Sequence, residues 1–170
     1  GSEVIEISPS DFAKSGYTVT GNKKETVLDD RNKFDDYAVK SNDLLISIKG
    51  TIGKVAIIGD LSDDATFFPT QASAIIRLKN KKQAIIVYMF LKSDLGQFML
   101  SRITSGTTLP LIHFADTRRF KVPMLSESEA DDIVKKFEHE IELFNEINSL
   151  EKKSLRTVQN CLLVSSGFIP

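Results

Sequence analysis

Two short runs of hydrophobic residues flank a polar segment in the first third of the chain. Residues 44–48 and 55–58 are rich in Ile and Val, which is typical of buried β-strands. Between them, residues 49–54 read Lys-Gly-Thr-Ile-Gly-Lys, and Gly50 and Gly53 can adopt the positive φ that a tight reversal needs. The pattern predicts a buried β-hairpin with a cationic tip. Three tip side chains are expected to face solvent: Lys49, Thr51 and Lys54.

Helical spacing of hydrophobic residues begins after residue 84. The apolar positions recur three and four residues apart and Gly96 interrupts them, so we expect two short helices that contribute to the core. The residues of this apolar face are Ile85, Ile86, Met89, Phe90, Leu95, Phe98 and Met99. Short strands are also expected at residues 4–7, on an edge of the sheet, and at residues 73–78.

From Ser126 the pattern becomes that of one long helix. Serine is a good N-cap, and acidic residues in the first turn favour the positive end of the helix dipole. Neither Gly nor Pro occurs between Ser126 and Ser166, so at ~1.5 Å per residue the helix would reach about 50–60 Å. A domain of this size cannot cover that length, so beyond its first turns the helix is expected to need a partner. The residues assigned to this pairing are Phe137, Ile141, Phe144, Ile147 and Val158.

Two polar segments show no clear period. Residues 16–36 predict a long surface loop or a loose ribbon, which is either a solvated connection or a basic arm. Its cations are Lys23, Lys24, Arg31 and Lys33. Residues 102–110 place hydroxyl groups around Gly106, and they predict either an ordinary capping turn or a loop whose short donors contact phosphates. The candidate residues of this second segment are Arg102, Thr104, Ser105, Thr107 and Thr108.

The composition of the 170 residues is that of an ordinary globular protein, with 41% hydrophobic and 26% charged residues. The net charge of −1 argues against simple charge-driven binding to nucleic acid, but the charge is unevenly distributed. Basic residues predominate between residues 75 and 121, and acidic residues between residues 127 and 151. The single cysteine, Cys161, excludes an intrachain disulfide and fits a reducing cytoplasm. No apolar run is long enough to span a membrane.

Signatures of catalysis are absent from the sequence. It lacks the Asn/Asp-Pro-Pro-aromatic motif and the glycine-rich cofactor loop of an amino-methyltransferase, and it lacks a phosphate-binding loop. Residues 151–153 match the Glu-x-Lys end of a nuclease motif, but they lie in a charged helical segment with no Pro-Asp before them. His113 and His139 lack metal-ligand spacing. We therefore expect no active site, no metal and no cofactor.

Five blocks of sequence, in this order and spacing, resemble a known family. They are Asn-Asp-Leu-Leu-Ile-Ser-Ile-Lys-Gly-Thr-Ile-Gly-Lys-Val-Ala-Ile-Ile at 42–58, Gln-Ala-Ser-Ala-Ile-Ile-Arg at 71–77, Tyr-Met-Phe-Leu-Lys-Ser at 88–93, Ser-Gly-Thr-Thr-Leu-Pro at 105–110 and Phe-Lys-Val-Pro at 120–123. With these blocks the chain resembles the target recognition domain of type I restriction-modification specificity subunits. The resemblance implies a domain that reads a DNA sequence without catalytic activity. It also implies a long helix that pairs with a counterpart and docks onto modification-subunit partners.

The residues and the resemblance lead to one expected architecture. We expect an α+β fold in which a twisted, mostly antiparallel sheet centred on the hairpin carries short packed helices, in residues 3–124. A long, coiled-coil-like helix in residues 125–166 would serve dimerisation or subunit docking. The implied function is sequence-specific binding of double-stranded DNA in a cytoplasmic type I complex, directing methylation and cleavage by the modification and restriction subunits. A homodimer through the helix is one expected arrangement.

The expected DNA contacts come from three segments, with Lys and Arg on phosphates and loop side chains at base edges. They are Lys23, Lys24, Arg31 and Lys33 in the first loop, Lys49, Thr51 and Lys54 at the hairpin tip, and Arg102, Thr104, Ser105, Thr107 and Thr108 in the second. Two alternatives stay open. One is the specificity region of a fused type II methyltransferase-nuclease, and the other is a protein-interaction module built on the long helix that does not bind DNA.

Overall fold

The protein has both sheets and helices, in a computed structural model that describes residues 3–12, 22–25, 36–59, 61, 65–106, 108–117 and 120–165. The chain divides into two compact units, Gly1–Val134 and Lys135–Pro170. The described strands and short helices belong to the first unit, and most of one long helix belongs to the second. The predicted α+β class is therefore confirmed.

Two three-stranded sheets and a two-stranded ribbon make up the β structure of the described residues. The strands are β1 (Glu3–Ile7), β2 (Asn22–Glu25), β3 (Leu44–Ser47), β4 (Val55–Ile57), β5 (Ala65–Pro69), β6 (Ser73–Ile76), β7 (Thr104–Ser105) and β8 (Leu111–Ile112). One sheet has the order β2-β1-β5, and β1 runs antiparallel to β2 but parallel to β5. The other has the order β4-β3-β6 and is antiparallel, as is the β7-β8 ribbon. The predicted hairpin is the β3-β4 pair.

One expectation for the N-terminal part of the chain is wrong. The strand predicted at a sheet edge, β1, lies in the middle of its sheet, because β2 pairs with one side of it and β5 with the other. Part of the predicted long loop is the strand β2, whose residues pair in register with β1. A strand of polar composition is stabilised here by its partner strand rather than by its own hydrophobic pattern.

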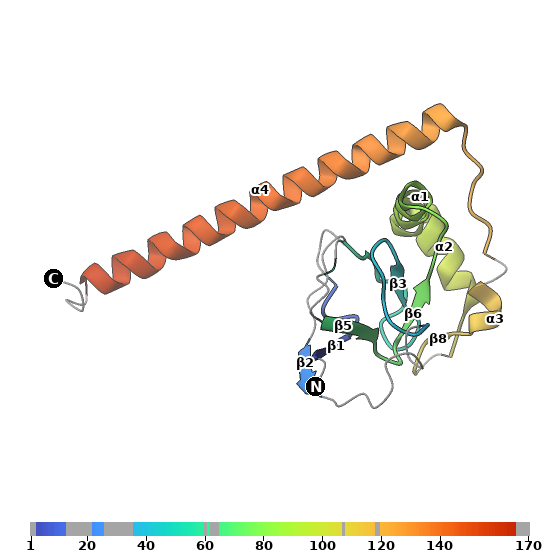
Figure 1. Ribbon diagram of the computed structural model, residues 1–170, viewed down its shortest axis with the longest axis horizontal. Helices are drawn as coiled ribbons and strands as arrows, with labels where there is room; N and C mark the ends of the chain where they lie inside the picture. The colour runs from blue at the N-terminus through green and yellow to red at the C-terminus, as the bar shows by residue number, and fades with distance from the viewer. Residues whose placement is uncertain are drawn as a thin grey trace. The chain divides into compact units, whose positions relative to one another are not determined.

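A hydrophobic cluster joins the two sheets. Its buried members are Ile7, Val39, Leu45 and Ile58, and the half-buried residues packed against them are Phe12, Leu61, Phe67 and Ile75. Ile7 and Phe67 come from β1 and β5 of one sheet, and Leu45 and Ile75 come from β3 and β6 of the other. The other four residues lie outside the strands. Figure 1 shows the β4-β3-β6 sheet between the helices α1 and α2 and the β2-β1-β5 sheet. The hairpin is therefore covered on both faces.

The helices are α1 (Lys81–Lys92), α2 (Asp94–Ile103), α3 (Phe114–Thr117) and α4 (Glu127–Ser165). The break between α1 and α2 occurs at Ser93 and not at Gly96, where it was predicted. The backbone N–H of Ser93 donates to carbonyl oxygens at the end of α1, and its side chain accepts from the backbone N–H of Gly96 at the start of α2. The helix pair is bent by 78° at this break. Gly96 instead provides close approach within the first turn of α2. A Cβ there would lie 2.0 Å from the carbonyl oxygen of Phe90.

The long helix α4 begins where Ser126 predicts it. The carboxylate of Glu129 accepts hydrogen bonds from the backbone N–H and the hydroxyl of Ser126, and these bonds lower the pKa of Glu129. Two further acids of this helix bind Lys82 of α1, which lies 2.6 Å from Asp131 and also contacts Glu127. The hydrogen bonds to Asp131 and Glu127 raise the pKa of Lys82. The start of α4 is thus fastened to α1 within the first unit.

A buried ion pair fixes the entry of the hairpin. Asp43, only 2% exposed, accepts hydrogen bonds from Arg77 Nε at 2.9 Å and Nη2 at 2.7 Å, and from the backbone N–H of Lys40 at 2.8 Å. Arg77 Nη2 also donates to the carbonyl oxygen of Ala38 at 2.9 Å. The hydrogen bond to Asp43 raises the pKa of Arg77. One guanidinium therefore connects the end of β6, the start of β3 and the segment before it.

Replacing Asp43 by Asn tests this pair. The amide removes the charge and turns an N–H group toward Arg77, so the free energy of unfolding should fall by about 3 kcal/mol. We place the loss at the low end of the range for buried pairs because the Arg77 side chain is 38% exposed. Urea unfolding measures it, with the exposed Asp132→Asn as the control. Equal stability of the two variants would show that the pair is not needed.

The variant Gly96→Ala tests the helix crossing. Alanine has a higher helix propensity than glycine by about 1 kcal/mol. Its Cβ would nevertheless meet the Phe90 oxygen at 2.0 Å and the Leu91 Cα at 2.8 Å, so we expect a net destabilisation. The expected loss is about 2 kcal/mol, measured as a lower midpoint in thermal unfolding. Ser101→Ala on the same helix is the control, and a stabilised Gly96→Ala variant would contradict the close approach.

Candidate nucleic-acid interface

The hairpin tip is a closed turn that leaves three polar side chains exposed. Ser47 and Lys54 bond twice, through Ser47 N to Lys54 O at 2.9 Å and through Lys54 N to Ser47 Oγ at 2.8 Å. Gly50 and Gly53 have φ angles of +77° and +84°, so both adopt the positive φ that was predicted for the turn. The side chains of Lys49, Thr51 and Lys54 are exposed, as expected.

Backbone hydrogen bonds join the tip to the second predicted segment. Gly50 N donates to Pro110 O at 3.1 Å, and Ile112 N donates to Ile48 O at 2.9 Å. Lys49 also forms an isolated antiparallel bridge with Leu111. Two loops far apart in sequence therefore present one surface, which we call the tip surface. Its described polar residues are Lys49, Thr51, Lys54, Ser105 and Thr108, and each of them is exposed.

Some hydroxyl groups of the second segment are already used in the fold. Thr104 Oγ1 donates to the carbonyl oxygen of Leu100 at 2.8 Å, at the end of α2. Ser105 Oγ donates to Leu111 O at 3.2 Å and lies 3.3 Å from Nε2 of His113. These hydrogen bonds are typical of an ordinary capping turn, which was one of the two alternatives for residues 102–110. Ser105 still keeps an exposed side chain beside the tip.

The cations at the tip surface have little competition from acids. Among the described residues, Lys49 has no ion-pair partner, and Lys54 Nζ contacts only the carbonyl oxygen of Pro9, at 3.5 Å. Arg102 is exposed in the last turn of α2, and it too lacks an ion-pair partner among them. An unpaired surface cation is the group that a phosphate can neutralise.

The residues predicted in the first loop are not brought to this surface by any described contact. Lys23 and Lys24 lie in β2, where they pair in register with Ile5 and Val4 of β1. Both strands belong to the β2-β1-β5 sheet, which does not contain the hairpin. The placement of these two lysines in a loop is therefore corrected. Arg31, Lys33 and also Thr107 of the second segment lie outside the described residues.

Sequence reasoning missed two residues that build the tip. Ser47 closes the turn as described, and Gln97 of α2 donates its side-chain amide to Gly53 O at 2.9 Å. A serine at the end of an apolar strand and a glutamine in a helix have many ordinary roles, so neither gave a signal. A shallow depression lies between the tip, α2 and the second segment. Its lining residues are Ile52, Gly53, Gln97, Leu100, Ser101, Thr104 and Pro110.

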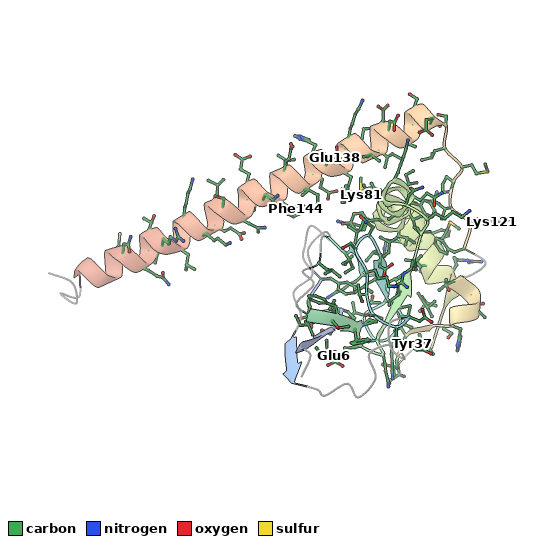
Figure 2. The ribbon with its side chains drawn as sticks, viewed as in Figure 1. Glu6, Tyr37, Lys81, Lys121, Glu138 and Phe144 are labelled. Carbon is green, nitrogen blue, oxygen red and sulfur yellow. The ribbon has the colours of Figure 1, made fainter. Side chains whose placement is uncertain are left out.

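The apolar residues predicted for helix pairing differ in exposure. Phe137 is 2% exposed, Ile141 and Phe144 are half-buried, and Ile147 and Val158 are 48% and 55% exposed. Leu143 and Leu150, at 46% and 56% exposed, flank Ile147 at helical spacing. Figure 2 shows side chains along most of α4, with Glu138 and Phe144 labelled. With Leu155, the exposed apolar residues of α4 thus extend from Leu143 to Val158.

The described residues contain no group of three or more His, Cys, Asp or Glu side chains that could hold a metal ion. None of their helices is by itself long and apolar enough to cross a membrane, and only the bent pair α1 and α2 passes that test, by length and composition. Ala84, Ile85, Tyr88 and Leu91 of α1 are buried.

Comparison with known proteins identifies the class of this domain. A family model described as "Type I restriction modification DNA specificity domain" matches residues 6–156, which is most of the chain. The protein is therefore a DNA specificity domain. It belongs to the type I restriction modification DNA specificity domain family.

A solved structure shares the fold. The S subunit of the type I restriction-modification system from M. genitalium superposes with a TM-score of 0.50 at 18% sequence identity, and the match covers 85% of this chain. This chain spans 32% of the length of that subunit. The comparison with curated proteins gives no match.

Proposed function

We propose that the chain reads a duplex DNA sequence through the tip surface and so directs the modification and restriction subunits of a type I complex to their target. The family supports the class of function, and the exposed cations Lys49 and Lys54 on a fixed turn support the site. The chain itself carries no catalysis in this proposal, because its family is a specificity domain. We propose a cytoplasmic location, since the ligand is duplex DNA.

The residues have different roles in this proposal. Lys49, Lys54 and Arg102 neutralise phosphates and fix the register on the duplex. Thr51 and Thr108 reach base edges, because among the described residues their hydroxyl groups have no hydrogen-bond partner. Ser105 and Thr104 have hydroxyl groups engaged with carbonyl oxygens, so they mainly shape the loop. Lys23, Lys24, Arg31, Lys33 and Thr107 remain proposed contacts without a described place at the tip surface.

We propose that residues 3–124 recognise DNA and that residues 125–166 form a helix for association.

 We propose that this helix pairs with a second helix, either of another copy or of a partner subunit. The exposed stripe of Leu143, Ile147 and Leu150 supports this, because its spacing of four and three residues is that of a coiled-coil seam.

Charge reversal at the tip tests the DNA interface. The double variant Lys49→Glu and Lys54→Glu removes two cations, so the slope of log affinity against log salt should fall by about two. Affinity for a short random-sequence duplex should drop about tenfold or more at low salt. Fluorescence anisotropy with labelled duplex measures both quantities.

The matched control for this experiment reverses two exposed lysines of α4, Lys135→Glu and Lys136→Glu, with the same change in net charge. If both double variants lose the same affinity, the effect is one of net charge and the tip is not the site. An unchanged slope in the tip variant would also remove the tip from the interface.

Sedimentation of the intact chain tests the helix. We expect a dimer that dissociates when Leu143, Ile147 and Leu150 are all changed to Gln, with a dissociation constant raised at least about 100-fold. Phe137 is left unchanged, because a polar residue at a site only 2% exposed would test folding rather than association. The control is the triple variant Glu142→Gln, Glu146→Gln and Lys153→Gln. A wild-type monomer would contradict pairing between two copies and leave a partner subunit as the helix's ligand.

A further inference from the structure

One side-chain amide connects the hairpin tip to the two core helices. Gln97 lies in the first turn of α2, and its Nε2 donates to Gly53 O at 2.9 Å and to Leu91 O at 2.7 Å. A side-chain amide nitrogen carries two hydrogens, so both are used. The reverse orientation would turn Oε1 toward two carbonyl oxygens and is therefore excluded on electrostatic grounds.

Among the described residues, the two acceptors of Gln97 have no other hydrogen-bond partner. Leu91 O belongs to the last turn of α1, where carbonyl oxygens have no N–H donor within the helix. Gly53 O belongs to the tip turn. Gly53 also gives the amide room, because a Cβ on it would lie 2.7 Å from Gln97 Oε1. Glycine at this position thus serves both the positive φ and the approach of Gln97.

In the part of the chain that the structure describes, backbone bonds hold the tip on its other flank. Gly50 N bonds to Pro110 O and Ile48 O accepts from Ile112 N. Gln97 is the side-chain contact that ties the returning limb of the turn to the helices. In sequence, Lys49 lies between Ile48 and Gly50, Thr51 lies between Gly50 and Gly53, and Lys54 follows Gly53 directly.

We propose that Gln97 is a positioning residue for DNA reading. It fixes the tip turn before DNA arrives, so the loss of freedom on binding is small and the tip side chains meet base edges in one geometry. Gln97 does not contact DNA in this proposal. The inference rests on the proposed function of the tip surface.

The test compares Gln97→Met with Gln83→Met. Methionine keeps the length of glutamine but has no amide donors, and Gln83 is an exposed glutamine of α1 whose side chain has no hydrogen bond among the described residues. The intact chain first selects duplexes from a random pool. Affinities of the wild type and both variants are then measured for a selected duplex and for a random-sequence duplex, as a function of salt.

For Gln97→Met we expect about tenfold weaker binding to the selected duplex, with binding to the random duplex and the salt slope unchanged. Phosphate contacts tolerate a mobile tip, whereas base reading does not. Amide exchange at Gly53 and Lys54, followed by NMR, should become faster. The Gln83→Met variant should match the wild type in every measurement.

Three outcomes would overturn the proposal. An unchanged preference for the selected duplex would show that the hydrogen bonds of Gln97 do not serve recognition. A lower salt slope would show that Gln97 itself contacts the DNA backbone. Unchanged amide exchange at Gly53 and Lys54 would show that Gln97 does not hold the turn. If the wild type selects no sequence, the proposed function fails and the positioning role fails with it, while the exchange data still report whether the contact restrains the tip.

Discussion

The buried carboxylate of Asp43 is the constraint on which the hairpin depends. A charge that is only 2% exposed must be matched, and Arg77 matches it with two hydrogen bonds while also binding Ala38 O. Because Asp43 precedes β3 and Arg77 follows β6, the pair fixes which residues of these strands face one another. A slip of one residue would exchange the side chains between the two buried faces of β3 and would separate the two charges.

The tip turn of the hairpin, residues 49–54, is restrained by hydrogen bonds on both sides. Ser47 closes it, the 110–112 segment holds one flank and Gln97 holds the other. The cations of the tip surface are therefore carried by a rigid support, which is what sequence reading requires of a protein loop. The acids at the start of α4 are meanwhile engaged with Lys82 and Ser126.

Sequence alone predicted the parts whose signals are local. Two apolar runs around Gly50 and Gly53 specify the hairpin, and Ser126 followed by Glu129 specifies the start of α4. It could not predict β2, because a polar strand is defined by its partner, nor the true role of Gly96, because a close approach between helices leaves no trace in spacing. Gln97 was missed for the same reason, since its acceptor in the tip, Gly53 O, is distant in sequence.

The tip is attached to the rest of the protein almost entirely through main-chain atoms. Gly50 N, Ile48 O, Gly53 O and the N–H of Lys54 make the bonds, and the side chains at positions 49, 51 and 54 make none of those that close the turn. Substitution at these three positions therefore leaves the scaffold intact. Under the proposed function, a domain built in this way can change its preferred DNA sequence by drift or selection at a few surface codons, without first acquiring compensating changes in its core.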